Sequence, residues 1–276
     1  TQTWRLAASE NPMGTGLNLM NIPSHDSYGI AVKRLFVPDD GCVFLKFDLS
    51  MAEARNFFWR TRDPQLREIA ASKPWEADVY KDIAGKMLGK ASEDVTKDER
   101  QVCGKKIGLA DNYGVGPKRI SDALAKEDYF YSVAECADYQ AKHFAAFPGI
   151  PAYQQRVINW AIKERTEQGV IRLRNSWGGS IDFRYERLDM PLFHRIFAFP
   201  SQSDIGIHNS RLGLIPFWEE KARRGWLSMP SAVVHDENLI SAWPEEAWDI
   251  CQFMVNMLQT AYEVGGAGML SIPVTV

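Results

Sequence analysis

Two aspartates lie where an apolar run meets a predicted turn, a position that holds a carboxylate rigidly at the edge of a sheet. Asp48 directly follows the run VFLKF, and Asp236 comes two residues after the run AVV. Two such carboxylates on adjacent strands would form a hard oxygen site of the kind that binds Mg²⁺. Two ions about 3.5–4 Å apart can activate an attacking hydroxyl and stabilise a leaving phosphate oxygen. A single aspartate after a strand is more often a turn or cap residue, so the pair is informative only with its surroundings.

The elements that position these aspartates are predicted to be strands. Residues 41–48 are apolar with aromatic and β-branched side chains, which is typical of a buried strand. Residues 231–240 have the pattern strand, tight turn, strand. A helix is expected to open at Pro244, because proline is favoured in the first helical turn. A final strand is predicted over residues 269–276.

The stretch between the two aspartates is predicted to be mainly helical. Helical periodicity recurs over residues 52–60, 78–90, 98–109, 118–126, 133–147 and 152–167. Two short runs around residues 177–179 indicate a hairpin, and residues 192–214 have a helical pattern that Pro200 is expected to interrupt. The order strand, helical insertion, hairpin predicts an α+β fold with a helical lobe inserted into a sheet lobe.

Composition and cysteine spacing exclude several classes of protein. The chain has 276 residues, of which 45% are hydrophobic and 24% are charged, with a net charge of -3, and this excludes a disordered protein. No apolar run approaches the ~18–20 residues that span a bilayer, and the first residues, TQTWR, carry no signal region. The four cysteines are far apart without a C-x-x-C pair. We therefore expect a protein of the reducing cytoplasm that does not act at a membrane.

Charge is divided unevenly along the chain. Residues 156–187 hold seven basic and four acidic residues, whereas residues 231–276 hold six acidic residues and no lysine or arginine. The basic stretch is suited to phosphates and the acidic one to cations, with ordinary surface charge as the alternative.

Five blocks occur in a fixed order along the chain. They are TWRL, NP and NLMNIP within residues 3–23, DLSMAEAR at 48–55, K-x3-L-x3-Y-G at 105–114, FPSQSDI at 199–205 and HDE at 235–237. In this order they resemble the T-x-R-L…N-P…N-L-Q-N-I-P stretch, motif A, motif B, the P-x-Q-x-x-A-D-I segment and motif C of the DNA polymerase I family (family A). HDE alone occurs often by chance, but the five blocks together are specific. The resemblance covers essentially the whole chain and is greatest to phage members.

This resemblance implies the palm and fingers of a template-directed DNA polymerase, acting on primer–template DNA and dNTPs in phage or bacterial replication. The palm would be an antiparallel sheet with packed helices, formed by residues 1–57 and 188–276, and residues 58–187 would form the inserted, mainly helical fingers. The thumb and the 3′–5′ exonuclease are expected to be absent from this chain. We therefore expect that a second polymerase chain supplies the thumb and possibly the exonuclease, with a longer protein from which these parts have been removed as the alternative. A phage-encoded chain would act in the host cytoplasm.

The resemblance also implies the catalytic residues. Asp48 and Asp236 would bind two Mg²⁺ ions, and the carbonyl of Leu49 would complete the shell of the ion on the nucleotide side. Glu237 would be a secondary carboxylate near the primer terminus, with a solvated turn residue as the alternative. Lys105 would neutralise charge on the incoming triphosphate during transfer, with a solvated helical lysine as the alternative.

Other residues would contact the nucleotide and the DNA. Glu53 would lie under the sugar and leave no room for a 2′-hydroxyl, while Leu109 would pack against the sugar and base. Tyr113 would stack near the template base, because every base offers a π-face. Minor-groove acceptors look alike for every correct base pair, so donors there can check pair geometry without reading sequence. The residues expected to contact the primer–template are Arg5, Asn18, Asn21, Arg34, Tyr113, Gly114, Gln202 and His235.

The motif B block departs from the family pattern. The family has an arginine four residues before its lysine, but this chain has Gln101 there and Arg100 one residue earlier. A single-residue bulge in the helix would bring Arg100 into line with Lys105, and otherwise Gln101 would make a weaker phosphate contact. Tyr80 stands where the family has a histidine, and it can hydrogen-bond a phosphate without adding charge.

Two other functions remain open at this stage. A single-subunit RNA polymerase of related fold is one, and the glutamates Glu53 and Glu237 argue against it. The other is a decayed, non-catalytic polymerase subunit that acts as a DNA-binding scaffold. The presence of Asp48, Lys105 and Asp236 argues against decay, whereas the irregular motif B argues for it.

Overall fold

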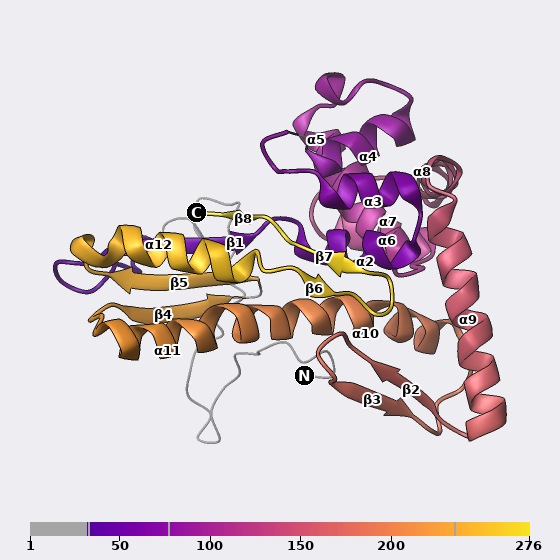
Figure 1. Ribbon diagram of the computed structural model, residues 1–276. Coiled ribbons are helices and arrows are strands. Elements are labelled where there is room, and N and C mark those ends of the chain that lie inside the picture. Colours follow the sequence, from indigo (N-terminus) through magenta and orange to yellow (C-terminus); the bar gives the residue numbers. More distant parts are fainter. Residues whose placement is uncertain (1–31, 33, 77, 235) are drawn as a thin grey trace. The chain divides into compact units, whose positions relative to one another are not determined.

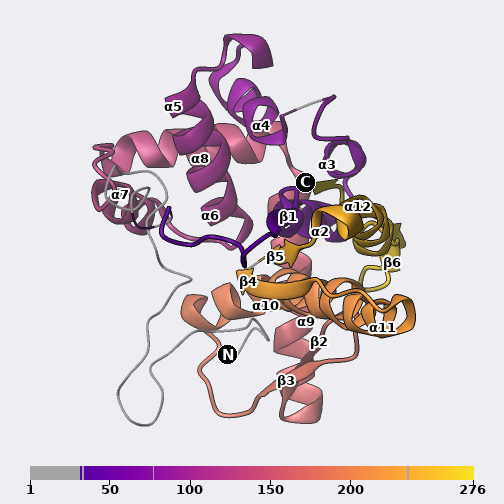
Figure 2. The ribbon, with the colours of Figure 1, turned by 90° about the vertical axis from the view of Figure 1, so that its left-hand side faces the viewer.

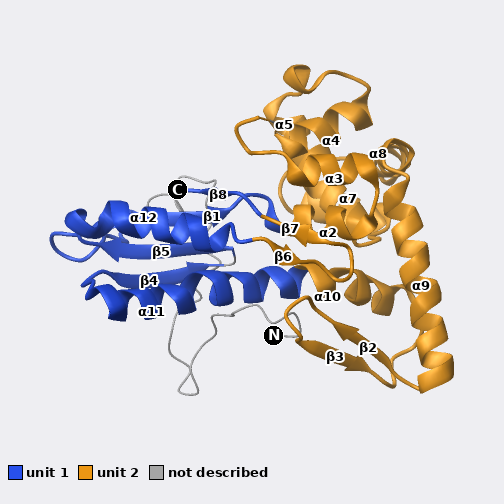
Figure 3. Cartoon of the chain, in the orientation of Figure 1, with its two compact units in different colours: residues 1–52, 202–260, 272–276 blue, residues 53–201, 261–271 orange. Residues whose placement is uncertain are grey.

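The structure, a computed structural model, describes residues 32, 34–76, 78–234 and 236–276 (Figure 1). The chain forms two compact units (Figure 3). Unit 1 comprises residues 1–52, 202–260 and 272–276, and unit 2 comprises residues 53–201 and 261–271. The division into palm and fingers at residues 57/58 and 187/188 remains a prediction about functional subdomains.

Unit 1 is built on a four-stranded antiparallel sheet with the order β4-β5-β1-β8. Its strands are β1 Val43–Leu49, β4 Met229–Val234, β5 Glu237–Ala242 and β8 Val274–Thr275. β1 pairs with β5 from Val43↔Ala242 to Asp48↔Glu237. The short β8 pairs with the end of β1, where Asp48 faces Thr275. This register brings the end of β1 next to the turn between β4 and β5.

Two helices cover one face of this sheet (Figure 2). They are α11 Ile215–Arg224 and α12 Pro244–Leu258, and a π-helix, η4 Asn209–Leu214, leads into α11. On α12, Ile250, Met254 and Leu258 recur every four residues and are fully or almost fully buried. Each such side chain contributes about 1.5–3 kcal/mol through removal from water. The apolar stripe predicted after Pro244 therefore faces the core of unit 1.

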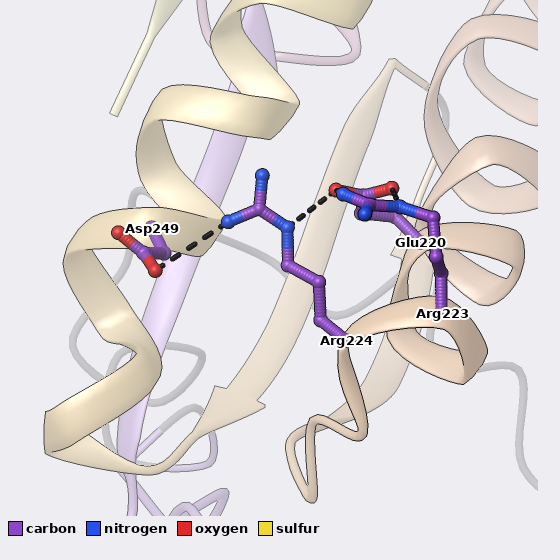
Figure 4. Close-up of polar contacts among 4 residues, drawn as sticks. All are labelled: Glu220, Arg223, Arg224 and Asp249. Carbon is purple, nitrogen blue, oxygen red and sulfur yellow. Dashed lines mark hydrogen bonds and ion pairs between the residues drawn. The ribbon is translucent and has the colours of Figure 1, made fainter.

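Ion pairs on the surface of unit 1 join α11 to α12 (Figure 4). Arg224 places Nη1 3.5 Å from Oδ2 of Asp249 on α12, and its Nε donates to Glu220. Hydrogen bonds from Arg223 and then Arg224 lower the pKa of the Glu220 carboxyl to about 2. Because exposed pairs of this kind are screened by water, they contribute little stability, and the buried apolar face of α12 contributes most.

Unit 2 is mainly helical. Its N-terminal caps follow from the sequence: Asp63 and Asp78 accept hydrogen bonds from the first turns of α3 and α4, and Thr96 and Ser132 form capping boxes. The helices are α2 Ala52–Thr61, α3 Pro64–Ala71, α4 Val79–Leu88, η2 Ser92–Asp94, α5 Lys97–Glu99, the π-helix η3 Arg100–Ile107, α6 Gly108–Asn112, α7 Pro117–Ala125, α8 Val133–Ala146, α9 Gly149–Gln168 and α10 Met190–His208, whose last residues belong to unit 1.

Two hairpins complete unit 2. β2 Ile171–Arg174 pairs with β3 Ser180–Phe183, as predicted, and β6 Tyr262–Glu263 pairs with β7 Met269–Leu270. The ring of Trp177, in the first hairpin turn, stacks on Tyr262 at a centroid distance of 4.8 Å and so links the hairpins. The β2–β3 hairpin shares one apolar core with α9 and α10, formed by Ala161, Ile171, Leu173, Phe183, Leu192, Phe193, Ile196, Phe197 and Phe199.

Two local predictions were wrong. α10 continues through Pro200, because burial of Ile196, Phe197 and Phe199 outweighs the ~3 kcal/mol cost of an internal proline. Residues 269–276 form two short strands in different sheets, and Pro273 between them lacks the N–H that a continuous strand needs. The helix predicted over residues 98–109 is present as the uninterrupted succession of α5, the π-helix η3 and α6. Within the described residues, none of the helices combines the length and apolarity needed to cross a bilayer.

Candidate active site

The two aspartates lie on neighbouring main-chain segments of unit 1. The backbone N–H of Leu49, next to Asp48, donates to the carbonyl oxygen of Asp236 at 3.2 Å. On the other side of β1, the Thr275 hydroxyl donates to the carbonyl oxygen of Asp48 at 3.3 Å. Both aspartates are half-buried. The structure therefore brings together Asp48, Leu49, Asp236 and Glu237, as the sequence predicts, through strand pairing between residues far apart in the chain.

Lys46 is a member of this cluster that the motifs did not single out. Its Nζ forms an ion pair with Oε2 of Glu237 at 2.7 Å. This hydrogen bond, together with attraction to Glu237, Asp48 and Asp236, raises the pKa of the Lys46 ammonium above its usual value. The signal was available in the sequence, because residues two apart on a strand share one face. The ion pair of Lys46 with Glu237 thus adds one positive charge to the carboxylates at this edge.

The carboxylates fit the way in which proteins hold Mg²⁺. Across the described residues, no three or more His, Cys, Asp or Glu side chains gather into a metal-binding group. Mg²⁺ sites of phosphoryl-transfer enzymes seldom need such a cage, because one or two carboxylates act together with waters and substrate phosphates. Asp48 and Asp236 match that donor set, and the carbonyl of Leu49 belongs to the same strand end.

The predicted bulge in motif B is present in unit 2. Residues Arg100–Ile107 form a π-helix, η3, in which hydrogen bonds run from residue i to i+5. Lys105 is five residues after Arg100, so the wider turn aligns them on one side of the helix. Arg100 Nε donates to Oδ2 of Asp78 at 2.5 Å, and its guanidinium lies 5.4 Å from the Tyr80 ring centroid. Lys105 is exposed, and Gln101 is half-buried beside it.

Close packing of η3 against α4 explains which residues meet here. A Cβ atom on Gly104 would come within 2.0 Å of the carbonyl oxygen of Tyr80, so only glycine fits between the two helices. The Asp78 carboxylate also caps α4, accepting from the backbone N–H groups of Tyr80 and Lys81 at 3.0 and 3.2 Å. Asp78 thus fixes the start of α4 and the position of Arg100 together.

The predicted sugar and template residues also meet within unit 2. The Tyr113 hydroxyl donates to Oε1 of Glu53, linking the first turn of α2 to the end of α6. Leu109, one helical turn before Tyr113, is half-buried. Gly114 adopts a φ of +72°, and its carbonyl accepts from His194 Nε2 at 2.8 Å. Burial lowers the pKa of the His194 imidazole below its usual value. The positive φ of Gly114, which glycine adopts without strain, forms a tight turn at the end of α6.

A buried network that the sequence did not reveal supports this turn. The Asp111 carboxylate is fully buried, with Oδ2 2.8 Å from His143 Nδ1 and Oδ1 accepting from Gln140 at 2.8 Å. Gln154 Nε2 donates to the carbonyls of Asp111 and Asn112 at 2.7 and 3.1 Å. These partners lie on α8 and α9, so only the folded structure reveals them.

Arg55, the last residue of the motif A block, forms hydrogen bonds with the end of helix α3. It is fully buried, and its Nη1 donates to the carbonyls of Ala70 and Ser72 at 2.6 and 2.5 Å. These carbonyls end α3, which has no further helical turn to satisfy them. Burial lowers the pKa of Arg55 to about 10.

The residues predicted to contact primer–template DNA are the least covered by the structure. Arg5, Asn18, Asn21 and His235 lie outside the described residues. Arg34 is exposed in a turn of unit 1, and Gln202 is half-buried on α10, whereas Tyr113 and Gly114 belong to the cluster in unit 2. Their contacts with DNA remain predictions.

Comparisons with known proteins agree with this arrangement. The family model "DNA polymerase family A" matches residues 1–182. The chain belongs to this family. DNA polymerase I of Caldicellulosiruptor bescii is 27% identical over 281 residues, which cover 100% of this chain and 30% of that protein. The DNA polymerase of Bacillus phage SP01 is 30% identical over 152 residues, covering 54% of this chain and 16% of the phage protein. The chain thus spans less than a third of the length of these family A relatives.

A solved structure supports the fold of this family A chain. The POL domain of Pol1 from M. smegmatis, in complex with DNA primer-template and dNTP, matches 99% of this chain and 45% of its own, with a TM-score of 0.81 and 21% sequence identity. This match, together with the antiparallel sheet of unit 1 and the helices of unit 2, confirms the predicted α+β palm-and-fingers fold class.

Proposed function

We propose that this chain carries the nucleotidyl-transfer centre of a template-directed DNA polymerase of phage or bacterial replication. One observation carries the proposal: in a family A chain, Asp48 at the end of β1 lies next to Asp236 in the β4–β5 turn, and the hydrogen bond from Leu49 to Asp236 joins the two segments. The substrates would be a dNTP and primer–template DNA, the ligands named for the solved M. smegmatis domain.

In this proposal Asp48 and Asp236 hold two Mg²⁺ ions, with the carbonyl of Leu49 on the nucleotide side. Bound there, the ions would activate the primer 3′-hydroxyl and stabilise charge on the leaving pyrophosphate. Lys46 already neutralises Glu237 through its ion pair, so the cations would chiefly balance the charges of Asp48 and Asp236. Glu237, held by Lys46, would lie near the primer terminus.

The phosphate-binding groups would come from η3 and α4 in unit 2. Lys105 is exposed, and Arg100 uses its Nε for Asp78, so its Nη groups can form the bidentate contacts that phosphates favour. Tyr80 would add a hydroxyl donor. Such groups balance the charge that develops on the triphosphate during transfer.

Selection of deoxynucleotides would depend on Glu53 and Tyr113. Their hydrogen bond holds the Glu53 carboxylate in one position, where it would lie under the sugar and exclude a 2′-hydroxyl. Leu109 would pack against the sugar and base. This pair favours DNA synthesis over the RNA polymerase alternative.

The proposal includes a thumb that is supplied from outside these 276 residues, by a second chain or by a further part of the same protein. Its supporting argument is chemical: contacts with duplex DNA act mainly through phosphates, and a polymerase needs many of them to remain on its substrate. We propose that extension by this chain alone is distributive and becomes processive when a thumb-bearing chain from the same source is added.

Primer extension on a mixed-sequence template tests the proposed function. With Mg²⁺, we expect template-directed incorporation of dNTPs by the wild type and none by Asp236→Asn. Preference for ribonucleotides would favour the RNA polymerase alternative. No incorporation of either kind, even with a thumb-bearing chain added, would favour the scaffold.

A further inference from the structure

A second polar cavity lies within unit 2, apart from the residues assigned above. It has a volume of about 430 Å³ and is lined by residues at the end of α2, on one face of α9 and in the loop between β6 and β7. The residues that line it are Arg60, Arg62, Tyr153, Arg156, Val157, Trp160 and Gly265. Three guanidinium groups and two aromatic rings thus face one space, and none of these lining residues is acidic.

The aromatic side is one face of α9. Tyr153, Arg156, Val157 and Trp160 follow at the spacing i, i+3, i+4 and i+7, which places them in one stripe of the helix. Trp160 is 36% exposed. An indole that borders a cavity and remains partly open to water offers a flat surface on which another ring can stack.

The cationic side is held in place by neutral oxygens. Arg62 donates to the carbonyl of Gly266 at 2.8 Å, and Arg156 donates to the carbonyl of Thr61 at 2.9 Å. Each of these two guanidiniums uses a single N–H in the hydrogen bonds among described residues, and neither forms an ion pair there. Since a guanidinium has five N–H donors, most of its donor capacity is left for a ligand.

The local backbone is shaped around these arginines. A Cβ atom on Gly265 would come within 2.1 Å of Arg60 Nη1, so this glycine permits the close approach of the guanidinium to the loop. Arg62 itself has a φ of +63°, a left-handed conformation that a non-glycine residue rarely adopts. Strain of this kind is concentrated at functional sites, because surrounding contacts must hold it.

Together, the arginines and the exposed tryptophan favour a ligand that has both a phosphate and a base. Guanidinium forks recognise phosphate oxygens, and an exposed indole recognises the face of a base. The volume is within the range of small-ligand pockets and suits a single nucleotide unit. Base faces are hidden in a duplex and accessible in a single strand, which favours single-stranded DNA.

Unit 2 also connects this cavity to the proposed template contact. The ring of Phe57 makes edge contacts with Tyr113 at 6.0 Å and with Tyr153 at 5.4 Å, measured between ring centroids. We propose that the cavity binds a nucleotide of the single-stranded template, with its phosphate on the arginines and its base on Trp160. The identity of the strand rests on the proposed function, whereas the phosphate-and-base chemistry does not.

Binding of fluorescent DNA by the purified protein tests this site without catalysis. Fluorescence anisotropy, with neither Mg²⁺ nor dNTP present, would compare a blunt duplex with the same duplex carrying a template overhang of about ten nucleotides. The quantity of interest is the ratio of the two dissociation constants, because contacts with the duplex cancel in it.

We expect the overhang to strengthen binding in the wild type. Trp160→Leu and Arg156→Gln should each reduce this gain about tenfold, the size expected for one stacked base or one charged contact. Arg156→Gln should also lower the salt slope of overhang binding by about 0.7. Two matched controls, Lys163→Gln on α9 outside the cavity lining and Trp75→Leu at another exposed tryptophan of unit 2, should leave the gain unchanged.

Three results would overturn the proposal. One is that the overhang strengthens binding by both cavity variants as much as it does for the wild type. Another is that the Lys163→Gln control loses as much of this strengthening as the cavity variants do. The third is competition by free dTMP or by an acidic peptide as effective as that of the overhang itself, which would assign the cavity to another ligand. Melting temperatures of all variants separate loss of the site from loss of the fold. A wild type with overhang binding but no primer extension would refute the proposed function alone.

Discussion

The two units hold the charged groups of the proposed reaction by different means. In unit 1, strand pairing joins Asp48 to the segment of Asp236, which is far away in sequence. In unit 2, Arg100 and Lys105 belong to one helix, and their alignment depends on the number of residues in its turn. The site in unit 1 therefore depends on pairing between strands, whereas the site in unit 2 depends on the number of residues between Arg100 and Lys105. The first site should be disrupted when a carboxylate on the paired segments is replaced, and the second when Arg100 and Lys105 no longer lie on one side of the helix.

The largest effect is expected from the carboxylates of unit 1. Asp48→Asn or Asp236→Asn should lower the rate of single-nucleotide incorporation about a thousandfold or more, because each removes a charge that would balance a metal ion. Glu237→Gln should cost much less, since Lys46 already neutralises Glu237. Rapid-quench measurement of one incorporation step gives these rates. Equal losses in all three variants would remove the distinction between metal-binding and secondary carboxylates.

A tenfold or greater effect is expected from the helix of unit 2. Arg100→Gln should raise the KM for dNTP about 10- to 100-fold, because a charged hydrogen bond to phosphate is lost. Deletion of Gln101 would convert the π-turn into an α-turn that again aligns Arg100 with Lys105, so KM should stay within about threefold of the wild type. Steady-state kinetics give the KM for dNTP of each variant. If the deletion raises KM as much as Arg100→Gln does, the bulge itself is required.

These two predictions also show what the sequence could and could not reveal. The proximity of Asp48 to Asp236 and the bulge beside Arg100 were both predictable, because the order and spacing of the motifs indicate them. Lys46 was accessible from strand alternation but was overlooked. The buried partners of Asp111 and the position of Arg55 could not be found, because they depend on contacts between helices distant in sequence. Pro200 was misjudged because tertiary burial outweighed a local preference.

A smaller effect is expected for sugar selection. Glu53→Ala should reduce discrimination against ribonucleotides about 10- to 100-fold, the range of a steric change in a pocket. Tyr113→Phe removes only the hydroxyl that positions Glu53 and should reduce discrimination less. The ratio of kcat/KM for dATP and ATP measures this. Glu68→Ala, an exposed glutamate of unit 2, serves as the control and should not change the ratio.

An effect of a different kind concerns the stability of unit 1. Burial lowers the pKa of His208 from 6.5 to about 4, although its hydrogen bond with the carbonyl of Leu258 and the nearby Asp204 act to raise it. Between these two values the unfolded chain binds a proton that the folded chain does not, so stability must fall as the pH drops from 6.5 to 4. The loss should reach about 3 kcal/mol at most.

Urea unfolding followed across this pH range checks the effect of His208. The pH-dependent loss should be largely absent in His208→Gln, which cannot take up the proton. An identical pH dependence in wild type and variant would show that other groups control the acid stability of unit 1.

The most direct test of the central claim is metal binding by the two aspartates. Mn²⁺ can replace Mg²⁺ at hard oxygen sites, and electron paramagnetic resonance measures the free ion in the presence of primer–template and a non-hydrolysable dNTP. We predict that Asp48→Asn and Asp236→Asn each weaken Mn²⁺ binding at least about tenfold, while Asp40→Asn, an exposed aspartate of unit 1, binds as the wild type does. Unchanged binding in both site variants would contradict the account.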